Sequence, residues 1–174
     1  MHQLLLVRHA KSSWDDPKLV DRDRPLNKRG RRAAASMREA IVDLGLIPDM
    51  VLTSPALRVQ QTLGALEPWD ETPLVETIEA LYLATANQIL DLLREVNETV
   101  RSVMLIGHNP GMQELAGALA ASSVDSEIKR RLLAGFPTAA LAEFSVATRW
   151  EQLSAGGARL VRFLTPKALA ESAG

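Results

Sequence analysis

Residues 4–9 read Leu-Leu-Leu-Val-Arg-His, a short unbroken apolar run that passes directly into an arginine and a histidine. A run without polar alternation is typical of a strand covered on both faces, as in a parallel sheet with helices on either side. Arg8 and His9 then stand at the carboxyl end of that strand, the edge where ligands bind in α/β folds. The stretch therefore predicts both the architecture and the position of a site.

The rest of the chain alternates between short apolar runs and helical patterns. Besides residues 4–7, strands are expected over 50–53, 103–106, 139–144 and 160–163. Helix starts are expected where capping or helix-opening residues precede apolar stripes, at Lys28, Ser54-Pro55, Thr85 with Gln88, and Asn109-Pro110. The first helix should span 28–44. This order predicts the α/β class, a three-layer α/β/α sandwich with right-handed crossovers around a mainly parallel central sheet.

Length and composition limit the class of protein. The 174 residues fit one domain, and 47% hydrophobic with 24% charged residues is typical of a folded globular chain. No apolar run approaches the roughly 18 residues of a membrane span, and the run at 4–7 is too short for a signal peptide, so a cytoplasmic protein without a membrane anchor is expected. The net charge of -1 shows no basic excess for nucleic-acid binding, and without cysteine there is no thiol nucleophile.

Three of the predicted strand-to-helix junctions carry residues suited to anion chemistry: Arg8 with His9, Arg58, and His108. Because the carboxyl ends of parallel strands share one edge of a sheet, these side chains are expected to converge. Arg58 falls in the first turn of its helix, where the helix dipole disfavours a cation unless an anion lies nearby. Two arginines offer planar forks that match phosphate oxygens, so the pattern predicts a phosphate pocket.

Two other chemistries compete for the same residues. A catalytic zinc usually takes three protein ligands; His9 and His108 supply two, no third has a recognisable spacing, and the arginines would repel a cation. Serine catalysis is disfavoured because Ser54 precedes a proline, outside a Gly-x-Ser-x-Gly elbow. The residues therefore favour histidine as the nucleophile, with no metal site and no cofactor.

Four motifs stand in the order found in one known family. They read Arg-His-Ala at 8–10, Asp-Arg-Pro-Leu-Asn-Lys-Arg-Gly at 23–30, Thr-Ser-Pro-Ala-Leu-Arg at 53–58 and Ile-Gly-His-Asn-Pro-Gly at 106–111. With them the chain resembles the histidine phosphatase, or phosphoglycerate mutase-like, superfamily, as a single domain over 1–174. Two further segments, at 9–14 and 136–140, are similar to its small SixA-type phosphohistidine phosphatases.

The resemblance implies roles for particular residues. It implies that His9 is the nucleophile that becomes phosphorylated, and that Arg8, Arg58 and His108 bind the phosphoryl group around it. On this scheme His9 is expected to be neutral and His108 protonated. The implied partner is a phosphorylated protein, and the sequence sets no oligomeric state.

The loop over residues 11–24 could cover the pocket or be an ordinary exposed connection. If it folds inward, Ser12 and Asn27 are further candidates for phosphate contact. The loop aspartates could also supply a proton; they are Asp15, Asp16, Asp21 and Asp23. Ala10 replaces the glycine of the family signature, which a turn of negative φ tolerates.

The chain departs from the family at the general acid. Phosphomonoesterases and mutases of the superfamily usually carry a glutamate in a Leu-x-Glu motif, where this chain has Leu-Tyr-Leu at 81–83 and Glu79 two residues early. An alkoxide leaving group needs a proton in the transition state, whereas an imidazole leaves more easily. The missing acid is compatible with cleavage of a phosphorus–nitrogen bond, and the resemblance to SixA-type phosphatases implies phosphohistidine in a protein as the substrate. A small phosphorylated molecule, turned over by a phosphomonoesterase or mutase, is one alternative, and a non-catalytic phosphoryl-binding module is another.

Overall fold

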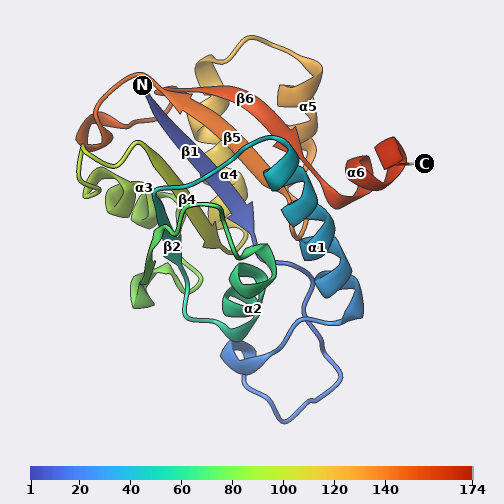
Figure 1. The fold of residues 1–174 in the computed structure, drawn as a ribbon. Helices are drawn as coiled ribbons and strands as arrows, with labels where there is room; N and C mark the ends of the chain where they lie inside the picture. Colours follow the sequence, from blue (N-terminus) through green and yellow to red (C-terminus); the bar gives the residue numbers. More distant parts are fainter. Residues whose placement is uncertain (174) are drawn as a thin grey trace.

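A six-stranded sheet forms the middle layer of the computed structural model, which describes residues 1–173 (Figure 1). Its strands lie in the order β3-β2-β4-β1-β5-β6. Their bounds are His2–Arg8 (β1), Met50–Thr53 (β2), Leu74–Thr77 (β3), Ser102–Gly107 (β4), Leu141–Val146 (β5) and Ala158–Leu164 (β6). The first four strands pair in parallel, while β5 pairs antiparallel with both β1 and β6. The predicted α/β class with a mainly parallel sheet is confirmed.

Strand β1 lies inside the sheet because it is apolar on both faces. Residues 4–7 are at most 1% exposed, and alternate members of this run join the cores on opposite faces of the sheet. β1 pairs in parallel with β4, and Arg8 stands opposite Gly107. The residues that follow these two strands, His9 and His108, therefore emerge as neighbours at one edge of the sheet.

Helices cover both faces of the sheet, as the three-layer prediction requires (Figure 1). One face carries α1 (Lys28–Asp43), α2 (Leu57–Leu66) and α6 (Pro166–Ala173). The other carries α3 (Ala86–Arg94), α4 (Gly111–Leu119) and α5 (Glu127–Ala134). Within residues 1–173, no helix has the length and apolar character needed to cross a bilayer.

Local sequence signals set two of the helix starts correctly. Helix α1 begins at Lys28 as predicted, and the Asn27 side chain caps it by accepting from the Gly30 amide at 2.8 Å. Thr85 and Gln88 form the predicted capping box ahead of α3. In both cases the capping partner lies three residues away, so the signal is contained in the sequence.

The predicted cap at Ser54 is wrong. Helix α2 begins at Leu57 with Ala56 at the N-cap, and the Ser54 hydroxyl lies 2.7 Å from His108 Nε2. The Ser54 hydroxyl bonds to a residue that is distant in the sequence, and the helix begins three residues after Ser54. Strand β3, α5 and α6 carried no prediction; all four residues of β3 are exposed, so this edge strand lacks a burial pattern.

Candidate active site

His9 directly follows β1 and is 7% exposed. Its Nδ1 lies 2.7 Å from the carbonyl oxygen of Ala10. A carbonyl can only accept, so Nδ1 donates and, in the neutral ring, Nε2 carries the lone pair. Burial, followed by the charges of Arg58 and Arg8, lowers the pKa of His9 to about 4 despite the bond to Ala10. At pH 7 His9 therefore presents a neutral, nucleophilic nitrogen.

Arg58 is a buried cation in the first turn of α2, with 3% of its surface exposed. Its Nε lies 3.4 Å from His9 Nε2. Its Nη1 donates to the backbone oxygen of Asp21 at 2.7 Å, and its Nη2 donates to the Asp21 carboxylate at 3.0 Å. Asp21 is the anion that makes a cation tolerable at this helix end. The guanidinium is thereby fixed against the imidazole of His9.

His108 follows β4 and faces His9, with 5.3 Å between the ring centroids. Arg58 Nη2 lies 3.4 Å from its Nδ1, so Nδ1 accepts and Nε2 donates to the Ser54 hydroxyl at 2.7 Å. Burial, followed by the charges of His9 and Arg58, lowers the pKa of His108 to about 3. In the free protein His108 is therefore neutral at pH 7, because the ring is desolvated and adjoins a buried arginine. Its expected protonation during phosphoryl transfer stays a prediction.

Arg8 ends β1, and its side chain is held by the segment that follows α5. Its Nη1 donates to the backbone oxygen of Phe136 at 3.0 Å, and the Asn109 side-chain amide donates to the same oxygen at 2.9 Å. Arg8 Nε is buried and has no hydrogen-bond partner within residues 1–173. Burial and the charge of Arg58 lower the pKa of Arg8. Loss of a guanidinium proton is not a realistic outcome at neutral pH, so Arg8 stays a cation with donor capacity to spare.

These side chains meet around a cavity of about 310 Å³. It is lined by Arg8, His9, Lys11, Ser12, Trp14, Arg24, Arg58, Leu83, His108, Asn109 and Thr138. Four of these residues are cationic and none is acidic, so the cavity concentrates positive potential. It suits a small, strongly charged anion such as a phosphoryl group.

The structure brings most of the predicted site residues together. The ones that line the cavity are Arg8, His9, Ser12, Arg58 and His108. Asn27 does not line it, because its side chain is used to cap α1. A role for Asn27 in phosphate contact is therefore not supported by its position.

Comparison with known proteins identifies the family. The family model of the histidine phosphatase superfamily (branch 1) matches residues 4–81. A solved structure from Agrobacterium tumefaciens, named as a proposed phosphohistidine phosphatase SixA, is 32% identical, covers 95% of this chain and 98% of that one, and gives a TM-score of 0.78. The chain belongs to the histidine phosphatase superfamily.

Two other relatives extend the comparison. A structure from Nakamurella multipartitia, also named as a proposed phosphohistidine phosphatase SixA, is 28% identical, with a TM-score of 0.82 over 95% of this chain and 96% of that one. An uncharacterised chloroplastic protein of Arabidopsis thaliana is 33% identical over 132 residues, which are 70% of this chain and 61% of that protein. This chain thus spans less than two thirds of the Arabidopsis relative. The resemblance of this histidine phosphatase superfamily member to SixA-type proteins is confirmed.

The loop over residues 11–24 brings a third arginine to the site. Arg24 is 7% exposed; its Nη1 donates to the Ser12 hydroxyl at 2.8 Å, and its guanidinium stacks 3.5 Å from the centroid of the Trp14 ring. The sequence reasoning missed Arg24, although it lies in one of the quoted family motifs. The loop therefore contributes to the cavity wall and is more than an exposed connection.

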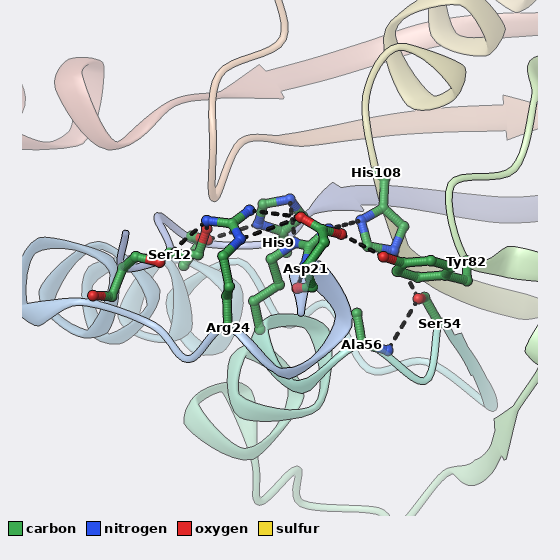
Figure 2. Close-up of polar contacts among 11 residues, drawn as sticks. His9, Ser12, Asp21, Arg24, Ser54, Ala56, Tyr82 and His108 are labelled. Carbon is green, nitrogen blue, oxygen red and sulfur yellow. Dashed lines mark hydrogen bonds and ion pairs between the residues drawn. The ribbon is translucent and has the colours of Figure 1, made fainter. Parts of the chain in front are cut away.

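Asp21 connects Arg24 to Tyr82, as Figure 2 shows, and it also binds Arg58. Its carboxylate accepts from Arg58, from Arg24 Nε at 3.2 Å and from the Tyr82 hydroxyl. Burial raises the pKa of Asp21, but the hydrogen bonds from Tyr82 and Arg58 outweigh it and lower that pKa to about 2. Asp21 is therefore ionised at neutral pH and organises the arginines; it does not donate a proton. Glu79 is exposed and paired with Arg22.

Across the described residues 1–173, no three histidine, aspartate or glutamate side chains gather closely enough to coordinate a metal ion. Four cationic side chains line the cavity beside two neutral histidines, and this set of groups suits an anion.

Proposed function

We propose that this histidine phosphatase superfamily member removes phosphoryl groups from histidine side chains of proteins by transferring them to His9. The observation that carries the proposal is the state of His9: a neutral imidazole with an unprotonated Nε2, in a cavity lined by four cations and no acid. A nucleophile beside an anion pocket supports covalent phosphoryl transfer. The cationic side chains would take the role that a metal takes in other phosphatases, so turnover is expected to be metal-independent.

In the first step His9 Nε2 attacks phosphorus, a new nitrogen–phosphorus bond forms, and the bond to the leaving group breaks with its electron pair. Arg8 and Arg58 hold the phosphoryl oxygens, and Arg24 adds positive potential from the loop. In the second step water attacks phospho-His9, inorganic phosphate leaves, and the imidazole is restored. Catalysis rests on positioning and on electrostatic stabilisation of the transferring group.

His108 changes role when the anion arrives. In the free protein its pKa is lowered to about 3 by burial and by neighbouring positive groups. A phosphoryl dianion in the cavity opposes those positive charges and raises the pKa of His108. His108 would then gain a proton on Nδ1, give up the contact of that nitrogen with Arg58 Nη2, and donate to a phosphoryl oxygen.

The lack of a general acid supports phosphohistidine as the substrate class. No carboxyl group lines the cavity. Asp21, which bonds to Arg24 and Arg58 of the cavity wall, is ionised. A phosphoimidazole whose second ring nitrogen is protonated leaves as a neutral imidazole and needs no proton from the protein. An alkoxide from a sugar or glycerate phosphate does need one.

The test is hydrolysis of a phosphohistidine peptide beside a matched panel of phosphate esters, with and without a chelator. We expect the peptide to be preferred, the chelator to have no effect, and His9→Ala to be inactive. His2→Gln, a histidine substitution outside the cavity, is the control and should keep full activity. Preference for an ester would favour a phosphomonoesterase or mutase, and tight phosphate binding without turnover would favour a binding module. The cytoplasmic location stays a prediction.

A further inference from the structure

A larger groove opens beside the active-site cavity. Its volume is about 1110 Å³, and it shares two lining residues, Arg8 and Asn109, with that cavity. It continues past the end of α5, over Phe136 and Phe163, and along α6. A cavity of roughly 300 to 1,000 Å³ holds an entire drug-sized ligand, so the groove exceeds what a phosphoimidazole ring needs.

The groove carries cations that the rest of the protein leaves unpaired. Arg131 on α5 and Lys167 on α6 both line it, and within residues 1–173 neither forms an ion pair. The neighbouring Arg130, outside the groove, is paired with Glu127 at 3.1 Å. With Arg8 the groove has three cations against one acid, Glu171. This balance attracts carboxylates.

The groove and the active-site cavity are joined by shared hydrogen-bonded residues. Arg8 and Asn109 both donate to the backbone oxygen of Phe136, so the groove floor is fixed to the same side chains that border His9. Arg131 lies over the Phe163 ring, 5.9 Å from its centroid, which places its charge along the aromatic wall. A polypeptide with its phosphorylated side chain in the cavity can therefore pass Arg8 and enter the groove.

We propose that this groove binds an acidic segment adjacent to the phosphohistidine of the substrate protein, with Arg131 and Lys167 pairing with its carboxylates. The inference rests on the proposed function and adds the sequence class that the protein selects. Charge complementarity at the rim of a site sets specificity and association rate, and it weakens as salt is added. The groove therefore makes the reaction selective for acidic sequences around the reactive histidine.

The test compares two synthetic phosphohistidine peptides, one flanked by a run of glutamates and one by a run of glutamines, with phosphoimidazole as the small substrate. Two exposed ion pairs should give the glutamate peptide a preference of roughly fivefold to tenfold in kcat/KM, mainly through KM. Arg131→Glu combined with Lys167→Glu should abolish or invert the preference while phosphoimidazole turnover persists. High salt should remove the preference in the parent protein.

The control is Arg32→Glu combined with Arg159→Glu, which changes the net charge equally at two exposed arginines outside both cavities. It should keep the preference. Equal rates for the two peptides in the parent protein would overturn the proposal, as would a preference that survives the groove variant. If the parent protein hydrolyses neither peptide nor phosphoimidazole, the proposed function itself fails. If it hydrolyses phosphoimidazole but does not distinguish the two peptides, only the proposed role of the groove fails.

Discussion

Acidification provides a quantitative test of the buried nucleophile. Burial beside two arginines lowers the pKa of His9 to about 4, whereas an exposed histidine titrates near 6.5. The difference of roughly 2.5 units corresponds to about 3.4 kcal/mol favouring the neutral ring. At pH 5 about nine tenths of His9 should be neutral, against about 3% for an ordinary imidazole, so the active fraction is roughly thirtyfold larger.

The measurement is kcat/KM for phosphoimidazole and for a phosphohistidine peptide across acidic and neutral pH, since this constant reports the free enzyme. Rates from His9→Ala are subtracted, because these substrates also hydrolyse spontaneously in acid. We expect the acidic limb of the profile, where His9 gains a proton, to have its midpoint near pH 4 for both substrates. A midpoint near 6.5, or a catalysed rate that rises steadily below pH 5, would refute the assignment of His9 as a desolvated, neutral nucleophile.

Three further predictions concern stability and the support of the site. The two buried histidines of the cavity have folded-state pKa values of about 4 and about 3, below the unfolded value. Their contribution to stability is therefore full above about pH 6.5 and is lost as the pH falls toward 4. Urea unfolding at a series of pH values should show a loss approaching about 3 kcal/mol per pH unit, and a flat profile would contradict this prediction. Ser54→Ala removes the acceptor for the buried His108 Nε2; it should lower kcat/KM roughly tenfold and stability by about 1–3 kcal/mol, and an unchanged rate would show that the hydroxyl does not orient the ring. Gly30→Ala would place a Cβ 2.1 Å from the Lys11 carbonyl oxygen, so it should lower activity and should lower stability by about 1–3 kcal/mol. Gly64→Ala, where an added Cβ meets nothing within 4 Å, is the control and should be neutral or stabilising. Equal effects of the two substitutions would contradict the close packing of the loop on α1.

The sequence predicted the architecture well where the signal is local. The unbroken apolar run at 4–7 predicted a strand buried on both faces, and Thr85 with Gln88 predicted the start of α3, because each pattern is complete within a few residues. Edge strand β3 is fully exposed, so it lacked the apolar pattern by which strands are recognised. Its backbone pairing with β2, and not the burial of its side chains, holds it in the sheet.

The sequence predicted the two arginines and two histidines of the site. It did not predict the side chains that hydrogen-bond to Arg58 and position it. Arg58 could be linked to an anion because a cation in the first turn of a helix needs one. That the anion is Asp21, and that Tyr82 bonds to it from 61 positions away, depends on tertiary contacts that no short motif records. The neutral state of His108 has the same origin, since it follows from burial beside Arg58.

The most direct test of the central claim is to trap the phosphorylated protein and locate the phosphoryl group. The protein is mixed with a phosphohistidine peptide, quenched in alkali, where phosphohistidine persists, and examined by ³¹P NMR and by mass spectrometry of its peptides. Because Nδ1 of His9 is bonded to the Ala10 carbonyl, the phosphoryl group should lie on Nε2 of His9 and be absent from His9→Ala. A phosphoryl group on His108 or on Ser54, or turnover without any phosphorylated intermediate, would contradict the account.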